Sequence, residues 1–135
     1  MNKIILLFAT FLILNLTSCS TDDSSGNSSV IQINPPSWIQ GKWLQPSAQS
    51  LEAGYRFTSN DFIIIQANVE LSQRQQLQTF LDNDQNVSAS DSFTDSTYEV
   101  ILNYLGGQSV TYSFTKLSDT SITWDRAPSS IYDKQ

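Results

Sequence analysis

Carboxylates are the main side chains with which this chain could do chemistry. The sequence has no histidine and a single cysteine, so it excludes Ser-His-Asp and Cys-His catalytic arrangements. Glycoside hydrolysis needs two carboxyl groups that face one bond. The candidate carboxylates lie in a polar stretch where nothing predicts the burial that would raise a pKa: Asp82, Asp84, Asp91 and Asp95. We therefore expect a protein that is not an enzyme and that uses no cofactor.

The same polar stretch contains a partial calcium-loop pattern. Residues 82–86 read Asp-Asn-Asp-Gln-Asn, which is similar to the start of such a loop. A calcium loop then has glycine at its sixth position and glutamate at its twelfth, where this chain has Val87 and Phe93. A solvated acidic loop without a metal is the interpretation that the pattern favours.

The N-terminus has the layout of a secretory signal. Lys3 precedes an apolar run over residues 4–14, which is shorter than the roughly 20 residues of a membrane-spanning helix. The next segment, Leu16-Thr17-Ser18-Cys19, resembles the lipobox of bacterial lipoproteins. That resemblance implies cleavage after residue 18, lipidation of Cys19 with acyl chains such as palmitate, and a membrane anchor. The alternative is an ordinary signal peptide with a chance cysteine beside it.

Residues 19–34 are expected to form the lipidated cysteine and a flexible tether, because most of them are small, polar or acidic. Asp22 and Asp23, close behind Cys19, are similar to the acidic export signal of surface lipoproteins in the Bacteroidetes. The similarity implies an outer-membrane protein displayed on the cell surface. A periplasm-facing position is the alternative, because acidic pairs are common in linkers.

Residues 35–135 should form the folded domain, and most of it reads as short strands separated by turn residues. The clearest alternation runs from Ser109 to Lys116, where Val110, Tyr112 and Phe114 alternate with small polar residues. The other expected strands cover residues 37–44, 55–58, 62–66, 97–104, 121–124 and 131–132. The predicted fold is mainly β: an antiparallel barrel or half-barrel of six to eight strands.

One segment favours a helix instead. Residues 69–81 are rich in helix formers, and Leu77, Phe80 and Leu81 have the spacing of one helix face. Ser72 and Gln75 have the spacing of a capping box at the start of that helix. The polar residues 82–95 after it are expected to form a long loop.

The first strand carries Gly41-Lys42-Trp43, which resembles the Gly-x-Trp of lipocalins. Residues 55–61 and 112–122 are similar to the hairpins of small lipocalin-like lipoproteins of the Bacteroidetes. The resemblance, over residues 38–126, implies a lipocalin-like barrel in which Trp43 plugs the closed end. The chain is shorter than a full lipocalin, and the 69–95 insertion is not part of that pattern.

The expected interior residues are aromatic. Trp38 and Trp124 could line a ligand site, although a structural role is favoured for the tryptophans. Four side chains are expected to point inward, as plain core or as the wall of a ligand-binding pocket: Tyr55, Phe57, Tyr112 and Phe114.

The net charge of the chain limits the classes of partner that it can bind. Removal of the signal leaves six basic and 13 acidic residues, a net charge of −7, which does not suit nucleic acid. We expect a membrane partner through the lipid, and a domain that binds a small apolar ligand, a glycan or a protein. The alternative is a structural or inhibitory interaction protein with a filled barrel, such as an immunity protein or a subunit of an envelope complex. An open apolar pocket would favour the first, and an exposed apolar patch the second.

Overall fold

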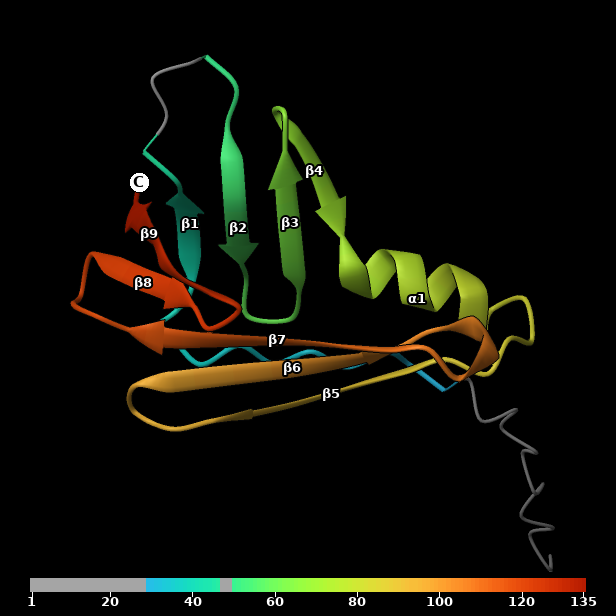
Figure 1. Ribbon diagram of the computed structural model, residues 1–135. Coiled ribbons are helices and arrows are strands. Elements are labelled where there is room, and N and C mark those ends of the chain that lie inside the picture. Colours follow the sequence, from blue (N-terminus) through green and yellow to red (C-terminus); the bar gives the residue numbers. More distant parts are fainter. Residues whose placement is uncertain (1–28, 47–49) are drawn as a thin grey trace, which may run out of the picture.

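A computed structural model describes residues 29–46 and 50–135. Nine antiparallel strands form one sheet, which curls into a half-barrel with one short helix (Figure 1). The strands are β1 (Gly41–Leu44), β2 (Ala53–Phe57), β3 (Phe62–Gln66), β4 (Val69–Ser72), β5 (Ser88–Phe93), β6 (Thr97–Asn103), β7 (Ser109–Lys116), β8 (Ser121–Trp124) and β9 (Ala127–Lys134). The helix α1 (Gln73–Leu81) joins β4 to β5, and a 3-10 turn η1 (Leu105–Gly107) joins β6 to β7.

The sheet order is β4-β3-β2-β1-β9-β8-β7-β6-β5, so β1 pairs with the last strand as well as with β2. Figure 1 shows β1 to β4 standing together, while β5, β6 and β7 run crosswise to them. The two edge strands are β4 and β5, and α1 contacts both. The helix therefore lies where a closed barrel would have a further strand pairing. The prediction of a mainly β, lipocalin-like half-barrel with one helix is confirmed.

The core fills the concave side of this sheet. Trp43, Tyr55, Phe57 and Phe114 belong to one cluster of buried side chains, which also includes Leu77 from α1. The alternation of β7 predicted this: Phe114 is buried, and Tyr112 packs against the same cluster. Burial of these side chains removes apolar surface from water, which stabilises the folded state by about 25 cal/mol for each Å² buried.

The helix begins as its sequence predicts. The backbone N–H of Gln75 donates to the Ser72 hydroxyl at 3.0 Å, so Ser72 is the N-cap. A second contact was not expected: Asp61, in the β2–β3 turn, accepts from the Ser72 hydroxyl at 2.6 Å and from the Arg74 N–H at 3.1 Å. A carboxylate at a helix N-terminus also interacts favourably with the helix dipole.

Several boundaries differ from the prediction. Residues 69–72 form β4 rather than the first turn of the helix, because Ala67 and Asn68 turn the chain back onto β3. Residues 88–93, expected within a loop, form β5 along β6. The first strand begins at Gly41 and not at residue 37, because residues 36–40 form turns that follow two prolines. The last strand is longer than expected, and the sheet has nine strands rather than six to eight.

The expected tether also ends earlier than residue 34. Ile31 and Ile33 are buried in the core cluster. The Ile31 N–H donates to Gln78 of α1 at 2.8 Å, and the Asn34 N–H donates to Asp91 of β5 at 2.5 Å. The folded domain therefore includes these residues, because two alternating isoleucines can be buried even in a segment without a regular strand.

Candidate functional site

Three of the four aromatic residues expected to line a pocket meet in the core, and the fourth, Tyr112, is half-buried and packs against their cluster. Tyr55 and Phe57 come from β2, and Tyr112 and Phe114 come from β7. The ring of Phe114 lies 4.8 Å from that of Tyr55 and 5.1 Å from that of Phe57, both edge to face. Phe62 fills the space beside them, with its centroid 4.9 Å from Tyr112. Side chains from two distant parts of the sequence thus occupy the inside of the half-barrel.

The buried phenols stay neutral. Burial raises the pKa of Tyr55 well above its usual value, and the neighbouring Tyr132 raises it further. Burial also raises the pKa of Tyr98, and Asp91, which accepts the Tyr98 hydroxyl at 3.2 Å, raises it further. Neither group can act as a base or a nucleophile near neutral pH. These two phenols are therefore neutral members of a mainly apolar core.

Trp43 lies in the core beside the C-terminal strand β9. Its indole N–H donates to the Ile39 carbonyl at 2.6 Å, and the Lys134 ammonium lies 5.0 Å from the ring centroid. Gly41 makes this arrangement possible, because a Cβ there would lie 2.8 Å from Cε of Lys134, and its φ is +132°. The other two tryptophans also pack on the core, and Trp38 donates to the Thr94 carbonyl at 3.0 Å.

The candidate carboxylates Asp82, Asp84, Asp91 and Asp95 do not gather into a metal site. Asp82 accepts from Gln78 at the end of α1, and Asp84 lies in a turn with a φ of +58°. Asp91 accepts hydrogen bonds from the Asn34 N–H and from the Tyr98 hydroxyl, and Asp95 is exposed. Among the residues that the structure describes, no three acidic, histidine or cysteine side chains are placed to hold a metal ion.

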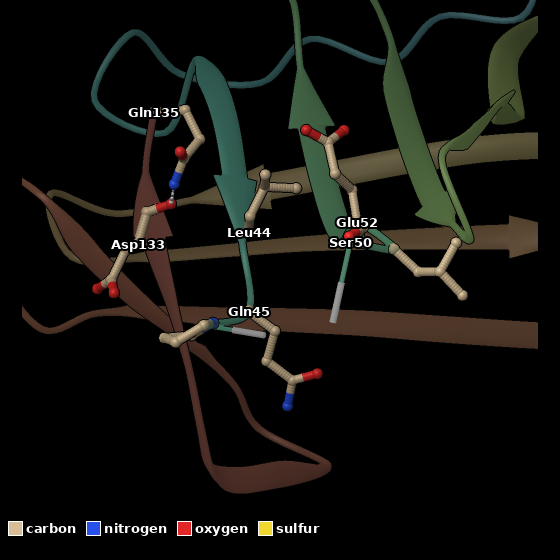
Figure 2. Close-up of a pocket in the computed structure, with 8 residues that line it drawn as sticks. Leu44, Gln45, Ser50, Glu52, Asp133 and Gln135 are labelled. Carbon is tan, nitrogen blue, oxygen red and sulfur yellow. Dashed lines mark hydrogen bonds between the residues drawn. The ribbon is translucent and has the colours of Figure 1, made fainter. Parts of the chain in front are cut away.

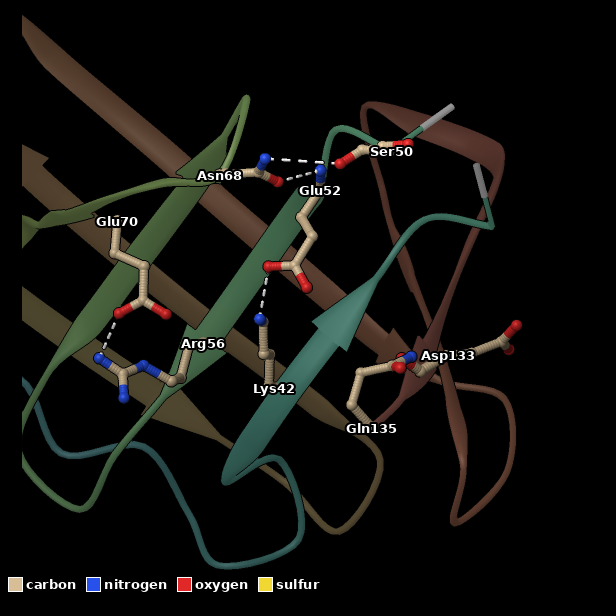
Figure 3. Close-up of polar contacts among 8 residues, drawn as sticks. All are labelled: Lys42, Ser50, Glu52, Arg56, Asn68, Glu70, Asp133 and Gln135. Atoms are coloured by element: carbon tan, nitrogen blue, oxygen red, sulfur yellow. Dashed lines mark hydrogen bonds and ion pairs between the residues drawn. The ribbon is translucent and has the colours of Figure 1, made fainter. Parts of the chain in front are cut away.

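The convex face of β1 to β4 carries two ion pairs (Figure 3). Lys42 contacts Glu52 at 2.5 Å, and Arg56 contacts Glu70 at 2.5 Å. Arg56 pairs across the sheet with Ile63, which is buried outside the main core cluster. Exposed pairs of this kind contribute about 0–1 kcal/mol each. Their main effect here is to leave the face without net charge.

A pocket of about 290 Å³ lies at the open end of β1 and β2 (Figure 2). Glu52 and Asp133 give it acidic groups, and Leu44 and Leu51 give it apolar surface. Its remaining lining residues are Gln45, Pro46, Ser50 and Gln135. Near it, Asn68 accepts the Glu52 N–H at 2.6 Å and holds the β3–β4 turn against this end of β2 (Figure 3).

A larger groove of about 410 Å³ runs beside the edge strand β4 and along α1. Glu70, Leu71 and Ser72 form the side that belongs to β4. Gln75, Gln76 and Thr79 form the side that belongs to α1. The groove is open, and its walls are amides, hydroxyls, one leucine and the Glu70 carboxylate, which is paired with Arg56. These groups can form hydrogen bonds and apolar contacts with a segment of another chain.

The sequence did not point to this groove. Val69 and Leu71 alternate with Glu70 and Ser72, which is a strand pattern. Because helix formers follow directly, these four residues were assigned to the predicted helix instead. The alternation itself was the signal that could have found the strand. The predicted lipidation residue Cys19 and the predicted export residues Asp22 and Asp23 lie outside the described residues.

Comparison with known proteins gives no relative. No protein family model, no curated protein and no solved structure matches this chain. In the described part of the chain, no helix is long and apolar enough to cross a membrane. The candidate sites in the described residues are therefore defined by geometry alone: a core filled with rings, a convex face with two ion pairs, and open hollows of about 290, 410 and 130 Å³.

Proposed function

We propose that this chain is a lipid-anchored, non-catalytic interaction lipoprotein that binds a protein partner with the outside of its half-barrel. The observation that carries the proposal is the filled interior: the rings of Tyr55, Phe57, Phe62 and Phe114 are in mutual contact where a ligand would lie. The two larger described hollows are on the outer surface, at the end of β1 and β2 and beside β4, and a third, of only about 130 Å³, opens at the end of β2 and β3 beside Tyr55 and Tyr132. This favours the interaction protein over a carrier of a small apolar molecule.

The membrane part of the proposal rests on the N-terminal sequence. The lipobox-like Leu16-Thr17-Ser18-Cys19 supports lipid attachment at Cys19, and Asp22 with Asp23 supports display on the outer surface. Two or more acyl chains give stable anchoring, since each buried CH₂ contributes about 0.8 kcal/mol. The domain begins near residue 30, so about ten residues separate it from the lipid.

The filled interior is tested with an apolar fluorescent dye such as N-phenylnaphthylamine. We expect no saturable binding to the wild-type domain, because a ring-sized ligand finds no space in the core. Phe114→Ala, probed with benzene, is the positive control, since it removes a whole ring from a fully buried site and an apolar cavity of that size takes up a molecule as small as benzene. Saturable binding to the wild type, competed by a fatty acid, would contradict the proposal and restore the ligand-carrier function.

The anchor is tested by fractionation of cells that express Cys19→Ser. We expect wild-type protein in the membrane fraction and the variant in the soluble fraction, because the acyl chains have no other attachment point. Protease treatment of intact cells then distinguishes surface display from a periplasm-facing position, with Asp22→Asn/Asp23→Asn as the matched variant for the export signal. Membrane retention of Cys19→Ser would overturn the lipoprotein part of the proposal.

A further inference from the structure

The edge strand β4 offers an unusually exposed apolar edge. Val69 and Leu71 are 55% and 45% exposed, although both lie on β4 next to the filled core. Natural edge strands usually carry free charges that prevent pairing with another chain. The one charge on β4 is Glu70, and Arg56 of the same chain neutralises it at 2.5 Å. This edge therefore lacks a free charge, and its short length of four residues is its remaining protection.

The backbone of β4 has hydrogen-bonding groups that point away from β3. Ala67 and Asn68 have φ values of +51° and +67°, which makes the β3–β4 turn a two-residue turn closed by Gln66 and Val69. In such a turn the N–H of Val69 faces the partner strand. Because the direction alternates along a strand, the N–H groups of Glu70 and Ser72 face the free side.

We propose that β4 pairs antiparallel with β4 of a second copy of this chain, about a two-fold axis at Leu71. In this register Glu70 lies opposite Ser72 of the second copy, and Leu71 lies opposite Leu71 of the second copy. The inference deepens the proposed function, on which it rests, by naming one partner of the interaction protein.

Side-chain chemistry selects a second copy as the occupant. The self-complementary register places each Glu70 opposite a serine, so no two carboxylates face each other, whereas directly opposed like charges destabilise a strand pair. The exposed Leu71 side chains meet at the axis and cover each other. The 410 Å³ groove between β4 and α1 leaves room for the β3–β4 turn of the second copy.

The contact is short, and its strength depends on anchoring. A strand of four residues buries less than the roughly 1,000 Å² of a stable interface, so free domains should associate weakly. Anchoring many copies in one membrane raises their effective concentration without any new contact. The experiment therefore uses the full chain in its membrane.

The test is cross-linking of Leu71→Cys in membranes under a mild oxidant. The two Cα atoms at the axis would be about 4.5 Å apart, which is within disulfide range. We expect a band at twice the chain mass on a non-reducing gel. Leu117→Cys is the control, because Leu117 is similarly exposed, at 52%, in the β7–β8 turn. The wild-type chain gives any background from Cys19.

A second variant separates strand pairing from random collision. Glu70→Pro removes the N–H that faces the free side and leaves the bonds from β4 to β3, so it should abolish the Leu71→Cys cross-link. Equal cross-linking of Leu71→Cys and Leu117→Cys, or full cross-linking in the presence of a folded Glu70→Pro, would overturn the pairing. Neither result would change the dye-binding or fractionation outcomes, so failure here is distinguishable from failure of the proposed function.

Discussion

Gly41 and Lys134 explain at the residue scale why Trp43 sits where it does. The backbone of Gly41 has a positive φ, and its missing Cβ leaves space for the carbon stem of Lys134. Lys134 can then reach across to the Trp43 ring from the paired position on β9. The sequence pattern Gly-x-Trp could be found without a structure, but its partner could not, because Lys134 lies about ninety residues away in the chain.

Gly54 allows the closest approach between β1 and β2. A Cβ at this position would lie 2.1 Å from the Trp43 carbonyl oxygen and 3.0 Å from the Leu44 Cα, both backbone atoms. Gly54→Ala should therefore push the two strands apart and lower the free energy of unfolding by about 1–3 kcal/mol or more. Urea denaturation followed by tryptophan fluorescence measures this loss.

Gly106→Asn is the matched control for Gly54→Ala. Gly106 also has a positive φ, of +70°, but a Cβ there would meet no atom within 4 Å. Asparagine tolerates this backbone conformation, so the change should cost well under the loss at Gly54. If both variants lose equal stability, close packing at Gly54 is not the cause.

At the scale of elements, the helices and strands that could be predicted from the sequence are those in which apolar residues recur at regular spacing. β7 was predicted with its observed bounds, and α1 was predicted with its observed end and with the Ser72 cap from its spacing to Gln75. The start of the predicted helix was wrong by the four residues that form β4. β5 was missed because its sequence, Ser-Ala-Ser-Asp-Ser-Phe, has few apolar residues. As an edge strand it needs only one neighbour, and its inward Asp91 is satisfied by Tyr98 and by the Asn34 N–H.

The N-terminal segment shows a second limit of local patterns. Ile31 and Ile33 are covered by distant parts of the chain, and Gln78 of α1 supplies the hydrogen bond to Ile31. Apart from these two isoleucines, residues 19–34 have mostly the composition of a polar tether. Composition alone therefore did not show that Ile31 and Ile33 belong to the folded domain. The groove beside β4 could not be predicted from local patterns either, because it depends on how α1 lies against an edge strand. Spacing within one element does not encode that placement.

At the scale of the whole molecule, α1 replaces part of a barrel wall. The sheet opens between β4 and β5, and α1 connects these strands while its Leu77 enters the core. Closure on the other side comes from β1 and β9, the first and last strands. The result is a half-barrel whose interior is filled by rings, with β4 left as an edge that another chain can reach.

The filled interior predicts how stability changes at high pH. Tyr55 and Tyr98 keep their protons in the folded state, because burial raises their pKa, while in the unfolded chain they ionise near pH 10. Their contribution is fully present below about pH 10 and is lost as the pH rises further. Each such phenol lowers the free energy of unfolding by up to about 1.4 kcal/mol per pH unit in that range.

Urea midpoints at about pH 8 and about pH 11 measure this loss, since the unfolded phenols ionise between them. Lysines titrate in the same range, so the wild-type curve alone does not isolate the tyrosines. Tyr98→Phe removes one buried phenol and leaves every lysine in place. Its stability should therefore fall less steeply than that of the wild type above pH 10. Equal slopes for the two proteins would mean that Tyr98 ionises as freely in the folded domain as in the unfolded chain, which a ring-filled half-barrel does not allow.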